Sequence, residues 1–418
     1  MSAFLVEGGR LLSGTAKVHG AKNSVLPILA ATILAEGESV LHNCPDLSDV
    51  TASLAILEHL GCRTRKEGDT ICVDATHVTE SDVPDQLMRE MRSSVIFLGA
   101  ILGRMGEAGL FFPGGCELGP RPIDLHLAAI RALGAEIREC GGELRCTGDH
   151  LTGCDITLSI PSVGATENAM LAAVRAQGVT TITNAAREPE IVDLQEFLLT
   201  MGAKVRGAGS SVITVEGGMP LHGGEHAVMG DRIVAATYLS AVAAAGGEAE
   251  VVGADYRHLS TVTAVLSEAG CRIHSDDKRI AICRSAPLRG VRPVRTAPYP
   301  GFPTDAQAPL MAVLARSEGT SVFVENIFES RFRHVDELAR MGANIRVEGR
   351  VAVVCGVPRL HGAEVRAADL RGGAALVVAA LGAQGRSAIT GLQHTDRGYQ
   401  DLDEVLRGLG ADIRRMDD

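Results

Sequence analysis

A short pattern of residues recurs six times along the chain and constrains its fold more than any other feature. In each copy, a segment of helix-forming residues ends at a glycine, and residues that favour an extended strand follow it. The six glycines are Gly61, Gly134, Gly202, Gly270, Gly342 and Gly410, at intervals of 73, 68, 68, 72 and 68 residues. Spacing this regular predicts an architecture built from one repeated structural unit.

A second set of glycines lies 23 to 28 residues upstream of the first and ends a second helical segment in each repeat. Its members are Gly37, Gly106, Gly178, Gly246, Gly319 and Gly385. Glycine ends helices because it adopts the left-handed backbone conformation without a steric cost. A short strand-like segment follows each of them. Each repeat is therefore expected to contain a helix, a strand, a second helix and two further strands joined by a turn.

The sixth repeat is incomplete, because only five residues follow its last strand-like start. Two extended segments near the other end of the chain, residues 4–9 and 15–20, belong to no repeat. We therefore expect the two chain ends to pair within one domain. A chain of 418 residues is too long for a single core. Three repeats per domain predict one domain over residues 22–229 and a second, discontinuous domain over 1–21 and 230–418.

The six helical segments that open the repeats are apolar on nearly all sides, which is typical of helices buried in a core. They are residues 26–35, 93–103, 169–176, 233–245, 308–315 and 374–383. None has the about 20 apolar residues that a membrane span requires. The first residues show no basic start followed by an apolar run, so we expect no signal peptide and a cytoplasmic protein.

Composition excludes several classes of partner. The formal net charge is −11, aromatic residues make up 3% and Trp is absent, so the chain has little with which to bind nucleic acid. Ten cysteines without a Cys-x-x-Cys motif indicate reduced thiols. Cys140 with Cys146, and His222 with His226, are interpreted as packing and loop residues rather than metal ligands. We predict no metal, no cofactor and no obligate protein partner.

Five of the six apolar helices carry charged residues before or within the first turn. These residues are Lys22, Arg92, Asp231 with Arg232, Asp305, and Asp369 with Arg371. Helix starts expose free N–H groups and favour anions. The three aspartates could simply cap these N–H groups. The cations oppose the helix dipole, and we interpret Lys22, Arg92 and Arg371 as ligands for a polyanionic substrate. We expect this active site to lie in the cleft between the two domains.

One segment, residues 111–126, does not fit the repeat. It combines glycines and prolines around Cys116, with Arg121 five residues further on. A thiol near a cation loses its proton more readily and can act as acid, base or nucleophile. A lone cysteine is usually a small buried residue, but this loop setting favours a catalytic role for Cys116.

Seven further segments form a specific pattern along essentially the whole chain. They are HGAKN at 19–23, PGGCELGPRPIDLH at 113–126, PSVGATEN at 161–168, NAAREPEIVD at 184–193, RTAPYPGFPTDAQAP at 295–309, FESRFRHVDELARMGA at 328–343 and HTDRGY at 394–399. In this order they closely resemble the UDP-N-acetylglucosamine 1-carboxyvinyltransferases, which belong to the enolpyruvyl transferases. The resemblance implies an α/β fold of two domains, the inside-out α/β barrel, with three repeats in each.

The resemblance also implies an activity. Enzymes of this kind transfer the enolpyruvyl group of phosphoenolpyruvate to the 3-hydroxyl of UDP-N-acetylglucosamine and release phosphate by addition and elimination, at the start of peptidoglycan precursor synthesis. Cys116 matches the family's proton donor, which forms a covalent adduct with phosphoenolpyruvate and is alkylated by the inhibitor fosfomycin. Asp305 matches the base at the sugar hydroxyl, and Lys22 with Asn23 matches the pair that binds phosphoenolpyruvate.

The remaining implied roles concern substrate binding. Phosphoenolpyruvate is expected to contact Arg121, Arg331, Arg371 and Arg397 as well, since guanidinium groups bind phosphate and carboxylate in two-point contacts. The nucleotide sugar is expected to contact Arg92, Arg121, Pro122, Ile123, Asp124, Leu125, Ser162, Val163, Gly164, Asp305 and Ile327. Asp231 and Asp369 are given supporting roles.

The chain departs from the family pattern in three places. Ile160 and Pro161 stand where some members have a lysine, Gln400 stands where glutamate is common, and Gly372 with Gly373 replaces bulkier residues. These departures affect what can be expected of substrate affinity and leave open a second isozyme with a specialised role. They leave the residues expected to carry the chemistry unchanged.

Three alternatives remain open. The related shikimate-pathway transferase shares the fold and uses phosphoenolpyruvate, but it lacks the cysteine loop. A paralogue that only binds nucleotide sugar would have no need of Lys22, Cys116, Asp305 and Arg397. A purely structural repeat protein would leave the cations at the helix starts unexplained.

Overall fold

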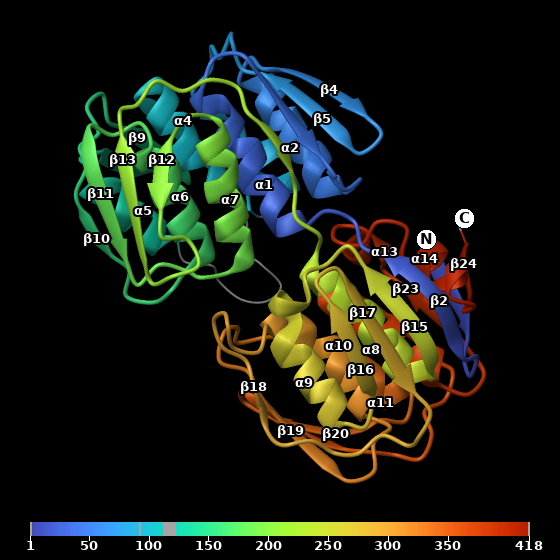
Figure 1. Cartoon of the computed structure of the whole chain (residues 1–418). Coiled ribbons are helices and arrows are strands. Elements are labelled where there is room, and N and C mark those ends of the chain that lie inside the picture. The colour runs from blue at the N-terminus through green and yellow to red at the C-terminus, as the bar shows by residue number, and fades with distance from the viewer. Residues whose placement is uncertain (1, 92, 112–122, 417–418) are drawn as a thin grey trace. The chain divides into compact units, whose positions relative to one another are not determined.

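The computed structural model describes residues 2–91, 93–111 and 123–416 and has the expected α/β fold (Figure 1). The described chain forms six sheets of four strands each. It divides into two compact units, the first from residue 20 to 229 and the second made of residues up to 19 together with those from 230 onward. No described helix is long and apolar enough to cross a membrane.

The first unit contains three repeats. The first repeat has α1 (Lys22–Ala31), the 3₁₀ helix η1 (Thr32–Leu34), β3 (Glu38–His42), α2 (Ser48–His59), β4 (Arg63–Glu67), β5 (Thr70–Asp74) and β6 (Asp82–Val83). The second has α3 (Asp85–Glu90), η2 (Ser94–Ile96), α4 (Phe97–Met105), β7 (Glu107–Phe111), α5 (Asp124–Ala132), β8 (Glu136–Cys140), β9 (Glu143–Thr147) and β10 (Asp155–Thr157). The third has α6 (Val163–Ala173), β11 (Gly178–Thr183), α7 (Pro189–Thr200), β12 (Lys204–Arg206), β13 (Val212–Gly217) and β14 (Glu225–Ala227).

The second unit begins with β1 (Ala3–Glu7) and β2 (Leu12–Lys17) and continues with three repeats. The fourth repeat has α8 (Arg232–Ala245), β15 (Gly247–Val252), η3 (Tyr256–Leu259), α9 (Ser260–Glu268), β16 (Arg272–Asp276), β17 (Arg279–Arg284) and β18 (Val294–Arg295). The fifth has α10 (Thr304–Leu314), β19 (Thr320–Val324), α11 (Val335–Arg340), β20 (Asn344–Glu348), β21 (Val351–Cys355) and β22 (Glu364–Arg366). The sixth has α12 (Leu370–Gly382), β23 (Arg386–Thr390), α13 (Leu392–Thr395), α14 (Leu402–Gly408) and β24 (Asp412–Met416).

Each of the first five repeats ends in a short strand of two or three residues, β6, β10, β14, β18 or β22, that the repeat pattern did not predict. In the first unit this strand pairs in parallel with a sheet of another repeat: β6 with β7, β10 with β11, and β14 with β3. The third repeat thus returns to the first, so the three sheets are linked in a ring. Strands of two or three residues are too short to show a period of two in the sequence, so the repeat pattern does not indicate them.

The chain ends pair as the sequence predicted. In the second unit β1 runs antiparallel to β24, with Val6 opposite Ile413, and also to β23. It supplies the central strand that the sixth repeat lacks. The next strand, β2, joins a different sheet, where it lies parallel to β15 of the fourth repeat. Figure 1 shows the labelled N and C ends next to each other in this unit.

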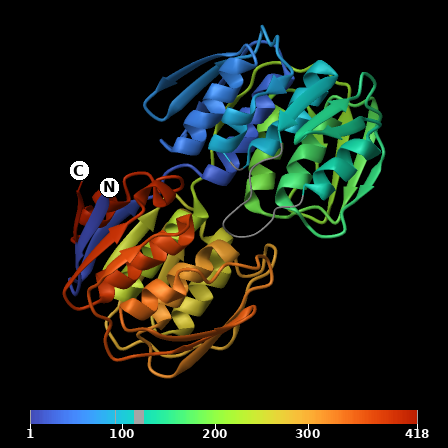
Figure 2. The same ribbon diagram turned by 180° about the vertical axis from the view of Figure 1, so that it is seen from behind.

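In both units the sheets lie outside and the apolar helices inside (Figures 1 and 2). In the second unit α8, α10 and α12 contact one another, and every residue of α8 is buried. The expectation of buried helices is therefore confirmed. The six regularly spaced glycines, from Gly61 to Gly410, also have the predicted backbone conformation: each has a positive φ, between 90° and 111°.

Candidate active site

In the second unit, charged residues gather where the three central helices begin. Asp231 precedes α8 and its carboxylate accepts hydrogen bonds from the backbone N–H groups of Ile233 and Val234, at 2.8 and 3.0 Å. Asp369 precedes α12 and accepts from the N–H groups of Arg371 and Gly372, at 3.0 and 2.9 Å. The capping interpretation therefore holds for these two aspartates.

Asp305 does not cap its helix. It lies in the first turn of α10, and its two carboxylate oxygens accept from two different arginines, Arg331 and Arg371, the second at 3.4 Å. The arginine side chains are 4% and 5% exposed, whereas that of Asp305 is 26% exposed. Burial raises the pKa of Asp305, but the charges of Arg371 and Arg331 outweigh burial and hold the pKa below its ordinary range. The carboxylate is therefore ionised and remains accessible.

Arg371 connects this pair to a third segment of the unit. Its guanidinium donates to the hydroxyl of Tyr399 at 3.3 Å and lies over the Tyr399 ring, 5.5 Å from the centroid. The Tyr399 hydroxyl is also 2.9 Å from that of Thr237 in α8. The chain from α13 to residue 399 is thereby held against the starts of the central helices, and this chain carries Arg397, which is half-buried.

The two adjacent glycines after Arg371 have a packing reason. A Cβ atom on Gly373 would clash with the hydroxyl of Thr395 in α13, and one on Gly372 would lie 3.1 Å from Cβ of His334. Contacts this close leave no room for a side chain. The Gly-Gly sequence, which departs from the family pattern, thus lets α13 and His334 approach the start of α12.

In the first unit, Lys22 is the first residue of α1 and is buried. Its ammonium group forms an ion pair with Asp49 in the first turn of α2, and the two side chains are 10% and 2% exposed. Asn23, the next residue, is exposed. Lys22 and Arg371 each have a carboxylate partner within their own unit, so their position at a helix start does not by itself require an external anion. Asp49 was not predicted as a site residue, because an aspartate in a first helical turn resembles an ordinary capping residue.

The segments expected to bind the nucleotide sugar come together where α5 and α6 begin. Ser162 caps α6 by accepting from the N–H group of Ala165 at 3.4 Å. A Cβ atom on Gly164 would lie 2.8 Å from the His126 ring, which follows Asp124 and Leu125 at the start of α5. Burial lowers the pKa of His126 to about 4, so the ring is neutral near pH 7.

Asn168 fixes this junction. Its amide nitrogen lies 2.8 Å from Nδ1 of His126 and donates to the Val95 carbonyl at 3.0 Å, while its oxygen accepts from the Gly99 N–H at 2.6 Å. One side chain of α6 therefore holds α4 and α5 in place. This contact explains why the PSVGATEN segment ends in a buried polar residue.

Several predicted site residues cannot be placed. Arg92, Cys116, Arg121 and Pro122 lie outside the described residues. Ile327 is described and is 38% exposed. Its backbone N–H group donates to the carboxylate of Glu325, two residues earlier, at 2.8 Å.

The structure also bears on the metal sites that the sequence raised. Within the described part of the chain, no group of three or more His, Cys, Asp or Glu residues is arranged to hold a metal ion. His226, which the sequence raised as a weak metal candidate, instead bonds to Asp193 at 2.9 Å.

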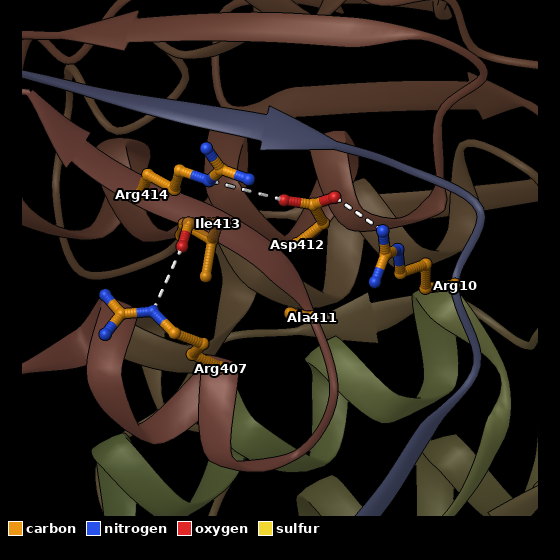
Figure 3. A pocket seen from close by; sticks show the side chains of 6 residues that line it. All are labelled: Arg10, Arg407, Ala411, Asp412, Ile413 and Arg414. Carbon is orange, nitrogen blue, oxygen red and sulfur yellow. Dashed lines mark hydrogen bonds and ion pairs between the residues drawn. The ribbon is translucent and has the colours of Figure 1, made fainter.

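A pocket of the second unit lies where α14 ends and β24 begins (Figure 3). It is lined by Arg10, Arg407, Ala411, Asp412, Ile413 and Arg414. Asp412 accepts from Arg10 at 2.7 Å and lies 3.9 Å from Arg414, so acidic and basic groups partly neutralise each other. None of the predicted site residues that the structure describes lines this pocket.

A buried carboxyl group lies beside the predicted nucleotide-sugar segment. Glu167 in α6 is 6% exposed, and burial, together with the charges of Glu190 and Glu188, raises its pKa from 4.5 to about 8. It is therefore largely protonated near pH 7. A folded-state pKa above the unfolded value means that Glu167 lowers the free energy of unfolding progressively as the pH rises from 4.5 through 8.

The variant Glu167→Gln removes this titration and should be more stable than the unmodified protein at pH 9, while the two converge near pH 4. The difference between their free energies of unfolding should grow by up to about 1.4 kcal/mol per pH unit between the unfolded-state pKa of 4.5 and the folded-state pKa of about 8. Urea unfolding across this pH range measures it. Glu196→Gln, at an exposed position of α7, is the control; parallel pH profiles for Glu167→Gln and the unmodified protein would contradict the assignment.

The chain is similar to known proteins along nearly its whole length. The family model described as EPSP synthase (3-phosphoshikimate 1-carboxyvinyltransferase) matches residues 6–406. UDP-N-acetylglucosamine 1-carboxyvinyltransferase 2 of Caldanaerobacter subterraneus subsp. tengcongensis is 52% identical over 416 residues, which is 100% of both chains. UDP-N-acetylglucosamine 1-carboxyvinyltransferase 1 of Symbiobacterium thermophilum is 49% identical, over 99% of this chain and 95% of that protein.

Solved structures share the fold of this chain. The enolpyruvyl transferase NikO from Streptomyces tendae superposes with a TM-score of 0.90 at 27% identity over 99% of each chain. An EPSP synthase from Acinetobacter baumannii shares the fold, with a TM-score of 0.77 at 19% identity over 100% of both chains. The chain therefore belongs to the enolpyruvyl transferase family, which includes EPSP synthase and the UDP-N-acetylglucosamine 1-carboxyvinyltransferases.

Proposed function

We propose that this protein transfers the enolpyruvyl group of phosphoenolpyruvate to the 3-hydroxyl of UDP-N-acetylglucosamine and releases phosphate, as the first committed step of peptidoglycan precursor synthesis. The observation that carries the proposal is 52% identity along the whole chain to a protein named for this activity. The motif residues Lys22, Cys116, Asp305 and Arg397 support it, because the chemistry needs a proton donor, a base and cations for a multiply charged substrate.

The proposed reaction has two stages. In the addition, Cys116 gives a proton to C3 of phosphoenolpyruvate, the sugar 3-hydroxyl attacks C2, and Asp305 takes the hydroxyl proton. In the elimination, the Cys116 thiolate takes a proton back from C3 and the C2–O bond to phosphate breaks, which restores the double bond in the transferred group. The departing phosphate accepts the proton held by Asp305, so both residues return to their starting states. Lys22, Asn23, Arg121 and Arg397 bind the phosphate and carboxylate of phosphoenolpyruvate in this scheme.

The two arginines at Asp305 impose a condition on this mechanism. A carboxylate whose pKa is held low by Arg331 and Arg371 is a weak proton acceptor. We propose that the anionic groups of phosphoenolpyruvate compete for these guanidinium groups when the substrate binds. Weaker pairing would raise the pKa of Asp305 and make it a better base at the step where a base is required.

The EPSP synthase match makes the shikimate-type reaction the second candidate function. We expect the purified protein to release phosphate from phosphoenolpyruvate only when UDP-N-acetylglucosamine is present. A coupled phosphate assay with each acceptor in turn decides between the two candidates. Release with shikimate 3-phosphate, and none with the nucleotide sugar, would overturn the proposal in favour of the second candidate.

Cys116→Ala should abolish turnover and the formation of a covalent adduct with phosphoenolpyruvate, because alanine can neither donate a proton nor form a thioether. Fosfomycin should add its mass to the unmodified protein and leave the variant unchanged, as intact-protein mass spectrometry would show. Cys355→Ala is the matched control, since Cys355 is a free, half-buried thiol in β21. A Cys116→Ala enzyme with ordinary turnover would remove this residue from the mechanism.

Asp305→Asn should lower kcat by about 10²- to 10⁴-fold, the usual contribution of a positioned acid or base. Asparagine has the same size and still accepts a hydrogen bond from an arginine, but it cannot take up the proton. Steady-state kinetics measure the loss, and calorimetric titration with UDP-N-acetylglucosamine checks that the variant still binds its acceptor. An unchanged kcat would show that another group is the base.

A further inference from the structure

Asp193 in α7 is 5% exposed and holds three groups from different parts of the first unit. Its Oδ2 accepts from the hydroxyl of Ser24 and from the backbone N–H of Met229, the latter at 3.2 Å. Its Oδ1 lies 2.9 Å from Nε2 of His226. The proposed mechanism makes no use of this carboxylate, although it is buried and both oxygens are occupied.

The groups that Asp193 holds surround the start of α1. Ser24 lies in the first turn, directly after Lys22 and Asn23. Met229 is the last residue of the first unit, and its carbonyl accepts from the N–H of Ala21 at 2.7 Å. Lys22 and Asn23 therefore lie between two anchored residues, Ala21 and Ser24. Asp193 holds Ser24 directly and Ala21 through Met229.

The start of α1 needs such an anchor from outside. The residue before the helix is Ala21, and no side chain caps the first turn. An uncapped helix start leaves N–H groups without a local acceptor and frays more readily. Asp193 supplies this anchor, because one buried oxygen, Oδ2, accepts from both Ser24 and Met229 and so ties the two groups together.

We propose that Asp193 is a positioning residue for the phosphoenolpyruvate-binding start of α1. It fixes the backbone of Lys22 and Asn23 by holding Ser24 and Met229 together. The inference rests on the proposed function for the identity of the ligand. Its structural part, that Asp193 keeps residues 21–24 ordered, stands on the contacts alone.

Two substitutions separate positioning from charge. In Asp193→Asn the carbonyl oxygen can still accept from Ser24 and Met229, and the amide can donate to a neutral His226. In Asp193→Ala all three partners lose their acceptor. Asparagine should therefore preserve the function of the aspartate, and alanine should not. Asp403→Ala is the matched control: Asp403 is also 5% exposed, accepts from Arg407 at 2.9 Å and belongs to the second unit.

In steady-state kinetics, Asp193→Ala should raise KM for phosphoenolpyruvate by about tenfold, the effect of leaving buried donors without an acceptor. KM for UDP-N-acetylglucosamine should stay unchanged, and Asp193→Asn should behave like the unmodified enzyme. Amide hydrogen exchange of residues 20–26 should be faster in Asp193→Ala than in the unmodified protein or in Asp403→Ala. If Asp193→Ala does not fold, Ser24→Ala is measured in the same way and should show the same two effects.

Unchanged exchange of residues 20–26 would overturn the positioning role, and so would equal increases in both KM values. The exchange measurement does not depend on turnover, so it separates the two proposals. An unmodified protein without phosphate release would refute the proposed function, while faster exchange in Asp193→Ala would still support the anchoring of α1.

Discussion

The central helices of each unit are covered by sheets and outer helices on all sides, and this burial decides where polar groups can lie. A helix such as α8, with every residue buried, can present charge to a ligand only at its ends. The starts of α8, α10 and α12 carry Asp231, Asp305 and Arg371. The apolar interior that stabilises the second unit is therefore also what gathers its charged groups at one end of its helices.

Charges placed at a buried helix end require partners, because an unpaired buried charge is costly. Lys22 has Asp49, and Arg371 has Asp305 and the ring of Tyr399. These pairs hold the cations in fixed positions before a substrate arrives. An anionic substrate then has to compete with a carboxylate that is already present, which favours ligands carrying more than one negative charge and disfavours weaker anions.

The sequence predicted those features that local backbone chemistry determines. The left-handed glycines at 61, 134, 202, 270, 342 and 410 ended helices as expected, since few other residues adopt that conformation cheaply. The pairing of β1 with β24 also followed from counting strands in the repeats. Side-chain contacts between distant residues were not predictable. The bonds of Asp193 to Ser24 and His226 and the pairing of Lys22 with Asp49 join residues 27 to 169 positions apart. The raised pKa of Glu167 arises from burial that one sequence does not reveal.

The two places where the chain passes between the units have the same construction. In the first unit the N–H of Ala21 bonds to the carbonyl of Met229 at 2.7 Å, and in the second the N–H of Asp231 bonds to the carbonyl of His19 at 2.9 Å. Each unit thus has its two connecting ends side by side, which is the arrangement of an inserted domain. The first unit is inserted into the second, between residues 19 and 230. Its three repeats close on themselves through β14 and β3, so the ring of three sheets is complete within the inserted segment.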